Sequence, residues 1–132
     1  MRWRGEGRCM ERILIIDDCK VMRDFLSDFL KEEGFDVYVT EDPDDAVGEL
    51  KRHHYALCIC DMHLSGIDGM AVVAQLEGED PKLRFIITDS LPDQRSVEQI
   101  EQSAYAYVHK PFELDQIREL IRHFLQPSKQ PK

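Results

Sequence analysis

The strongest constraint on the fold of this chain is a pattern of short apolar runs that alternate with stretches of helical spacing. Short continuous apolar runs are typical of buried strands, and apolar residues three or four positions apart are typical of amphipathic helices. Strands and helices that alternate in this way form a parallel sheet with helices on both faces, so we predict an α/β fold. The predicted strands are 13–16, 35–39, 56–60, 83–87 and 104–108, and the predicted helices are 21–30, 43–54, 68–76, 92–102 and 114–124.

The predicted strand 35–39 alternates apolar and polar residues, which indicates that it is covered less completely than the others. We therefore expect it at an edge of the sheet, in the strand order 2-1-3-4-5. This order defines a flavodoxin-like, doubly wound five-stranded parallel sheet with five helices. The predicted helix 92–102 has few apolar residues, so we expect it to be the least firmly held of the helices.

The length and composition of the chain indicate one domain. It has 132 residues, of which 42% are hydrophobic and 33% are charged, and this is enough for a single hydrophobic core. We expect a loose N-terminal extension over 1–10, a folded domain over 11–126 and a flexible tail over 127–132. No apolar run is long enough to cross a bilayer, and the N-terminus lacks the apolar segment of a secretory signal. We therefore expect a cytoplasmic protein without a membrane partner.

The net charge and the cysteines limit the classes of ligand. A formal net charge of −9 argues against direct binding of nucleic acid, because contact with a phosphate backbone needs basic surface. Cys58 and Cys60 alternate on an apolar run, and no second cysteine pair is present to complete a metal site. We expect both to be buried core thiols in a reducing compartment.

Polar residues that could take part in binding or catalysis follow four of the predicted strands. Asp17 and Asp18 follow the first strand, and Asp61 follows the third. Thr88 follows the fourth strand, and Lys110 lies just beyond the fifth. Each of them alone has an ordinary explanation, such as helix capping for an aspartate. In an open parallel sheet, however, the carboxyl ends of the strands share one edge, where ligands bind, so we expect all five side chains to meet there.

Three carboxylates at one edge repel one another unless they are protonated or neutralised. A divalent cation and Lys110 would neutralise them. Mg²⁺ suits such a site best, because it takes few carboxylates, keeps several waters and binds phosphate oxygens, and we expect Mn²⁺ to substitute for it. Asp61 can then act as a nucleophile toward a phosphoryl group and form an aspartyl phosphate. Lys110 and the Thr88 hydroxyl would bind the phosphoryl oxygens.

Four sequence segments, in this order and at these spacings, resemble the receiver domain of two-component response regulators. The segments are ILIIDD, ICDMHLSGIDG, FIIT and AYVHKPF, and the resemblance runs over 11–125. One such motif is weak evidence, whereas four together are highly specific. The chain is similar to the single-domain, chemotaxis-type receivers.

The resemblance implies a role for each acid of the cluster. Asp61 matches the phosphoacceptor of the family. Asp18 matches the direct Mg²⁺ ligand, Asp17 matches a ligand that acts mainly through water, and the backbone carbonyl of His63 matches the third protein ligand. Such a domain is a phosphoacceptor that assists its own phosphorylation and dephosphorylation, and in this sense we expect it not to be an enzyme.

The resemblance also implies a switch and partners. Thr88 matches the hydroxyl that is drawn toward the phosphoryl group, Tyr107 matches the aromatic residue that turns inward with it, and Lys110 matches the lysine that pairs with the phosphate. The bond from Lys110 to Pro111 matches a cis peptide. The implied donor is a histidine kinase or a phosphotransfer protein, and the implied output surface is the fourth helix, the fifth strand and the fifth helix. We expect the downstream partner or output domain to lie outside this chain, and dimerisation through that surface is left open.

Three positions depart from the family pattern. Ser65 replaces the usual proline after the acceptor, and Ser103 replaces a glycine before the fifth strand. The third departure is Asp89, which replaces a small residue after Thr88. Two interpretations of Asp89 are open: its side chain narrows access to Asp61 and repels the donor, or it points to solvent and caps the following turn.

Two positions tune the lifetime of the phosphoryl group in this family, and here they are His63 and Ser90. Neither is an acid or an amide that would readily hold an attacking water. We therefore expect slow self-dephosphorylation.

Three alternative functions remain at this point. A phosphatase of the haloacid-dehalogenase type would need a second aspartate two residues after Asp61, where His63 stands, and would turn over a phosphoester. A flavodoxin-like FMN carrier would be yellow and would need a phosphate-binding loop rich in Ser, Thr and Gly after the first strand. A degenerate receiver would act by protein contacts without phosphorylation, and Asp89 is the one feature that favours it.

Overall fold

The structure, a computed structural model of the chain, describes residues 11–89 and 105–125. Within these residues a five-stranded sheet has the order β2-β1-β3-β6-β7, with every neighbouring pair parallel. This confirms the predicted order 2-1-3-4-5. The strands are β1 (Arg12–Ile16), β2 (Asp36–Thr40), β3 (Leu57–Asp61), β6 (Arg84–Asp89) and β7 (Ala106–His109).

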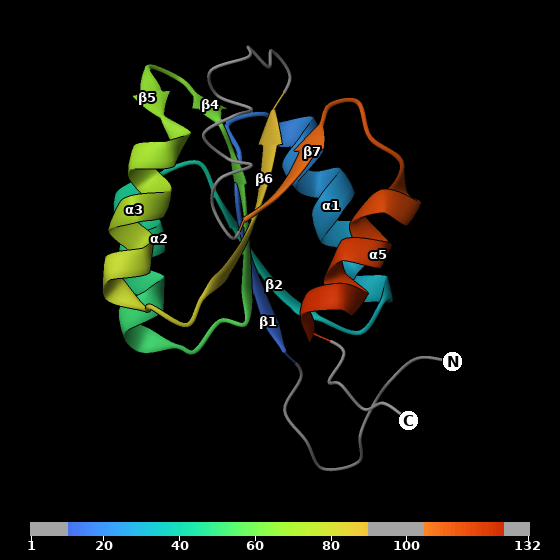
Figure 1. The fold of residues 1–132 in the computed structure, drawn as a ribbon, viewed down its shortest axis with the longest axis horizontal. Helices are drawn as coiled ribbons and strands as arrows, with labels where there is room; N and C mark the ends of the chain where they lie inside the picture. Colours follow the sequence, from blue (N-terminus) through green and yellow to red (C-terminus); the bar gives the residue numbers. More distant parts are fainter. Residues whose placement is uncertain (1–10, 90–104, 126–132) are drawn as a thin grey trace.

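Helices cover both faces of the sheet (Figure 1), as the apolar strands predict. One face carries α1 (Lys20–Glu32) and α5 (Leu114–Leu125), and the other carries α2 (Pro43–Arg52) and α3 (Gly69–Glu79). The predicted helix 92–102 lies outside the described residues. In the part of the chain that the structure covers, no helix is long and apolar enough to span a membrane.

Successive residues of β1 point to opposite faces of the sheet and join two separate hydrophobic clusters. Ile13 and Ile15 pack with the buried residues of α1 and α5, and Leu14 and Ile16 pack with those of α2 and α3. All four residues are fully buried. β2, by contrast, is mostly half-buried, as expected for the edge strand. The interior of the sheet is therefore apolar, and its buried polar residues lie at the ends of the strands.

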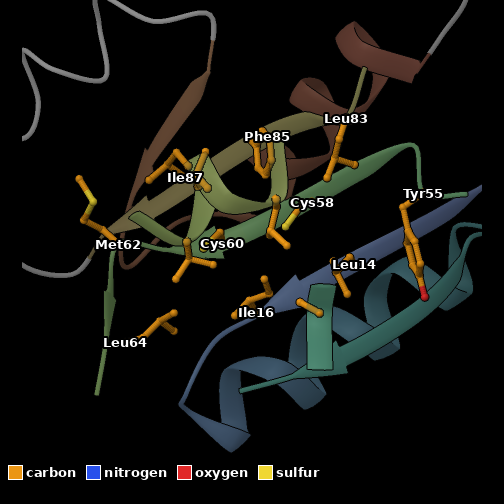
Figure 2. Close-up of a cluster of buried hydrophobic side chains, with 14 residues drawn as sticks. Leu14, Ile16, Tyr55, Cys58, Cys60, Met62, Leu64, Leu83, Phe85 and Ile87 are labelled. Atoms are coloured by element: carbon orange, nitrogen blue, oxygen red, sulfur yellow. The ribbon is translucent and has the colours of Figure 1, made fainter. Parts of the chain in front are cut away.

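Cys58 and Cys60 lie in the cluster beneath α2 and α3 (Figure 2), where both are free and fully buried. Burial raises the pKa of both thiols. They are therefore neutral core residues, as the sequence predicts.

Side chains begin the helices where the sequence predicts them. Asp42 caps α2 by accepting a hydrogen bond from the backbone N–H of Asp44 at 3.0 Å, and Pro43 fills the first turn. Asp68 caps α3 in the same way, accepting from Met70 at 3.0 Å. α1 begins after Cys19 without a side-chain cap, so its position depends on packing.

A small antiparallel hairpin, which the sequence analysis treats as a plain loop, connects β3 to α3. It consists of β4 (His63–Leu64) and β5 (Ile67–Asp68), and Gly66 turns between them with a φ of 67°. Gly69 follows at the start of α3, and its N–H donates to the carbonyl of Met62 at 2.8 Å. The end of β3 and the start of α3 are thereby held against each other.

We expect Gly69→Ala to destabilise the protein, because an added Cβ would lie 2.3 Å from the carbonyl oxygen of Asp61 and 2.7 Å from Met62 Cα. Overpacking against backbone should lower the free energy of unfolding by about 2 kcal/mol. Gly78→Ala is the matched control in the same helix: no atom lies within 4 Å of its added Cβ. It should raise the free energy of unfolding by about 1 kcal/mol through helix propensity. Urea unfolding of both variants checks this, and equal effects would contradict it.

A buried hydrogen bond joins α2 to the loop before β3. Tyr55 is 2% exposed, and its hydroxyl donates to Glu49 Oε1 at 2.6 Å. Arg52 donates to the other oxygen of Glu49 at 3.0 Å. The hydrogen bond from Tyr55 is the main reason that the pKa of Glu49 is lowered; burial opposes this, and the charge of Arg52 adds to it.

We expect Tyr55→Phe to lower the free energy of unfolding at pH 7 by about 2 kcal/mol, because a hydrogen bond to a charged group is lost. The folded pKa of Glu49 lies below its unfolded value of about 4.3, so this stability is present above that pH. It is lost as the pH falls through the lowered folded pKa. Urea unfolding at several pH values measures the effect. Tyr38→Phe, which removes a more exposed hydrogen bond to Asp45, should lower the free energy of unfolding by only about 0.5 kcal/mol. If the loss of stability in Tyr55→Phe does not depend on pH, the hydrogen bond to the charged form of Glu49 is not its cause.

Candidate functional site

The carboxyl edge of the sheet brings together residues that are far apart in the sequence. Asp17 follows β1, and Asp61 is the last residue of β3. Thr88 is opposite Asp61 in the pairing of β3 with β6. Lys110 follows β7, and its Nζ lies 2.9 Å from Asp17 Oδ2 and 3.3 Å from Asp61 Oδ2. These four residues therefore meet at one edge, as the strand order predicts.

Three carboxylates form a cluster at this edge. Asp17, Asp18 and Asp61 each offer one oxygen, and these oxygens all lie within 4.8 Å of one another. Asp17 and Asp61 are 2% and 4% exposed, whereas Asp18 is half-buried, so the cluster opens to solvent on the side of Asp18. A set of oxygen ligands of this kind fits a hard divalent cation such as Mg²⁺.

Burial disfavours the charged form of Asp61, and the positive charge of Lys110 favours it. Burial raises the pKa of Asp61; the charge of Lys110 opposes this rise, and the nearby charge of Asp17 adds to it. Burial alone would lower the pKa of Lys110, but the hydrogen bond and charge of Asp17, together with the charge of Asp61, raise it overall. Lys110 is therefore held as a cation between two acids.

Backbone contacts hold the loop that carries Asp17. Its Oδ1 accepts a hydrogen bond from the N–H of Cys19 at 2.9 Å. Arg23 reaches back from α1 and donates to the backbone carbonyl of Asp17 at 2.7 Å. The carboxylate thus has a fixed direction relative to Lys110.

Ser65 contacts the acid cluster, a role that the sequence analysis misses. Its hydroxyl donates to Asp18 Oδ2 at 2.6 Å, from the turn between β4 and β5. The available signal was the polar character of the residue that replaces proline, four positions after Asp61 in the chain. The hydroxyl thereby links the hairpin of β4 and β5 to the loop after β1.

Thr88 carries a polar atom that no described residue satisfies. Its side chain is 1% exposed, and Oγ1 has no hydrogen-bond partner among the described residues. A buried hydroxyl without a partner costs about 1–3 kcal/mol and calls for an explanation. The backbone carbonyl of Thr88 accepts from the N–H of Met62 at 2.7 Å, so the strand end itself is fixed. The free hydroxyl can therefore bind an oxygen of a ligand beside Asp61.

Asp89 is fully buried, so the interpretation in which it points to solvent is wrong. Its Oδ1 lies 3.0 Å from His63 Nε2, and its Oδ2 accepts a hydrogen bond from the Tyr107 hydroxyl at 3.0 Å. The carboxylate thus connects the hairpin after Asp61 with β7. No local sequence pattern pairs these three residues, so this link is not predictable from the sequence.

The remaining predicted residues lie around this centre. The backbone N–H of His63 donates to Asp61 Oδ1 at 3.2 Å, which places the His63 backbone beside the acid cluster. Tyr107 is half-buried on β7. The bond from Lys110 to Pro111 is cis, as the resemblance implies. Ser90, Ser103 and the predicted fourth helix lie outside the described residues.

The arrangement can support attack by a carboxylate on an electrophilic group that carries negative oxygens. Asp61 supplies the nucleophile, and Lys110 and Thr88 supply a cation and a hydroxyl beside it. The acid cluster can hold a metal ion next to the same carboxylate. An ionised carboxylate nucleophile needs no separate general base.

Comparison with known proteins agrees with this geometry. Residues 13–122 match the response regulator receiver domain. The chain is 31% identical over 116 residues to the chemotaxis protein CheY of Bacillus subtilis, an alignment that covers 86% of this chain and 97% of that protein. It is 25% identical over 116 residues to the sporulation initiation phosphotransferase F of the same organism, covering 87% and 94%.

Solved structures give the same result. The response regulator TrrA of Thermotoga maritima, in complex with Mg²⁺-BeF, is 28% identical with a TM-score of 0.76, covering 88% of this chain and all of that one. A CheY-like receiver domain of Methanospirillum hungatei is 23% identical with a TM-score of 0.81, covering 89% and 95%, and shows the shared fold. The chain belongs to the response regulator receiver domain family of two-component signalling.

Proposed function

We propose that this receiver domain accepts a phosphoryl group on Asp61 from a phosphohistidine donor. The observation that carries the proposal is the position of the Asp61 carboxylate, 3.3 Å from Lys110 Nζ and within the acid cluster. An Asp61 oxygen attacks phosphorus, the P–N bond of the phosphohistidine breaks, and its electron pair returns to the imidazole nitrogen. The product is an aspartyl phosphate, so the protein is a phosphoacceptor in this reaction.

Asp17, Asp18, Asp61 and the backbone carbonyl of His63 would hold Mg²⁺, with Mn²⁺ as a substitute. When bound, the cation neutralises part of the negative charge of the carboxylates and of the incoming phosphoryl oxygens. Lys110 lies between Asp17 and Asp61, so its ammonium can bind a phosphoryl oxygen without a large movement. The Ser65 hydroxyl would orient Asp18, to which it donates at 2.6 Å.

After transfer, Thr88 and Tyr107 would act as the switch. The Thr88 hydroxyl has no partner among the described residues, so a phosphoryl oxygen on Asp61 would satisfy it. Movement of Thr88 toward that oxygen would change the space available to the half-buried Tyr107 ring. The output surface, which we expect to comprise β7, α5 and the predicted fourth helix outside the described residues, would then bind a different partner. A histidine kinase or phosphotransfer protein in the cytoplasm would be the donor, and the output would be a downstream protein or a separate output domain.

The rival function is a receiver that acts by contact alone. Asp89 was its support in the sequence, as a bulky acid beside the acceptor. The carboxylate of Asp89 is engaged by His63 and Tyr107, which weakens the argument that it repels a phosphodonor. Phosphorylation is therefore the better supported function.

We expect Mg²⁺ to raise the free energy of unfolding of the parent protein, by about 2.7 kcal/mol at one hundred times its dissociation constant. Asp18→Asn should lose most of this gain, because one carboxylate of the cluster becomes neutral. Asp28→Asn, an exposed change of the same kind on α1, should keep the full gain. Urea unfolding with MgCl₂ or EDTA measures the effect; equal gains for parent and Asp18→Asn would argue against this metal site.

We expect the parent protein, incubated with Mg²⁺ and acetyl phosphate, to gain one phosphoryl group in an intact-mass measurement. Asp61→Asn should gain none, and Asp28→Asn should behave as the parent. A receiver that acts by contact alone becomes the better supported function if the parent gains no adduct and binds no Mg²⁺.

After removal of the donor, we expect the adduct to persist, because neither His63 nor Ser90 readily holds an attacking water. Loss of the adduct within a few seconds would exclude slow self-dephosphorylation.

A further inference from the structure

One carboxylate joins three segments that the sequence keeps apart. Asp89 is the last residue of β6, His63 begins β4, and Tyr107 lies in the middle of β7. Asp89 Oδ1 is 3.0 Å from His63 Nε2, and Asp89 Oδ2 is 3.0 Å from the Tyr107 hydroxyl. Each oxygen therefore serves a different neighbour. We call these three residues the Asp89 bridge.

Because Asp89 is buried, it depends on the two polar partners of the bridge. Its side chain has no exposed surface, whereas that of His63 is 45% exposed. A carboxylate cannot be buried at this depth without polar partners. Loss of either contact leaves an oxygen of Asp89 to be satisfied elsewhere, so we expect His63 and Tyr107 to respond to each other through Asp89.

The bridge contacts the proposed phosphorylation site at two places, at His63 and at Asp89. On one side, the backbone N–H of His63 donates to Asp61 Oδ1 at 3.2 Å. In the middle, Asp89 directly follows Thr88, and its backbone carbonyl accepts from the N–H of Lys110 at 2.7 Å. On the other side, the bridge ends at the hydroxyl of Tyr107. A change at Asp61 therefore has a short physical path to the Tyr107 ring.

We propose that Asp89 is a positioning residue that couples the orientation of Tyr107 to the acceptor loop at His63. The proposal deepens the proposed function, on which its role in switching rests, because Tyr107 is there the moving side chain. A small residue at position 89 would leave His63 and Tyr107 without a shared partner. Among the described residues, the coupling includes the polar contacts of Asp89 with His63 and Tyr107.

The experiment reads the Tyr107 hydroxyl directly, by NMR of protein carrying ¹³C at the tyrosine Cζ. The chain has four tyrosines, and the Tyr107 signal is the one that Tyr107→Phe removes. His63→Ala should shift the Tyr107 signal in the parent, because the two side chains are linked through Asp89. The Tyr105 signal is the internal control on the same segment of chain, because its hydroxyl donates to Glu77 at 2.7 Å.

The decisive comparison is the same His63→Ala change in an Asp89→Ala background. There the shift of the Tyr107 signal should disappear, while the Tyr105 signal stays unchanged in both backgrounds. Asp89→Leu, which keeps bulk but cannot accept a hydrogen bond, should give the same loss and replaces Asp89→Ala if that variant does not fold. A purely structural role for Asp89 would not abolish the dependence of Tyr107 on His63.

The proposal is overturned if His63→Ala leaves the Tyr107 signal of the parent unchanged, or if the shift is equal with and without Asp89. This outcome is independent of phosphorylation, because the comparison needs no phosphodonor. Intact-mass measurement on the same parent sample reports whether Asp61 accepts a phosphoryl group. Failure of the bridge and failure of the proposed function are thus told apart.

Discussion

The contact of Lys110 with Asp17 and Asp61 is the interaction on which the rest of the site depends. The lysine is separated from the two acids by 93 and 49 residues of sequence, and only the parallel strand order places them together. Without a cation between them, two acids that are 2% and 4% exposed would repel each other in a partly dry environment. The contact thus stabilises the edge of the sheet and at the same time places an ammonium beside the Asp61 carboxylate.

The fold and the centre of the site follow from local sequence patterns. The apolar runs predict strands buried on both faces, and the alternating run 35–39 predicts the edge strand that β2 forms. The helices predicted over 43–54 and 68–76 begin at Pro43 and Gly69, where Asp42 and Asp68 act as caps for residues only two positions away. The polar residues at the strand ends then meet by topology alone.

The contacts that no pattern predicts are those between side chains on different segments. The hydrogen bond from Ser65 to Asp18 spans 47 residues, and it depends on the hairpin of β4 and β5, whose strands have two residues each. The direction of the Asp89 side chain depends on His63 and Tyr107 in other segments, so the local sequence allows two interpretations of it. Such geometry is decided by packing and register, which the sequence of one segment does not contain.

Residues that can bind a ligand and residues that position others differ in this site by whether their polar atoms already have partners among the described residues. Asp61 is buried at the expense of its charged form, and Thr88 Oγ1 has no partner among the described residues. Both groups stand to gain from a phosphoryl group, a cation or both. Asp89 is more deeply buried than Asp61, but one of its oxygens lies 3.0 Å from His63 Nε2 and the other accepts a hydrogen bond from the Tyr107 hydroxyl. It has little to gain from a ligand, and its contribution therefore lies in where it holds His63 and Tyr107.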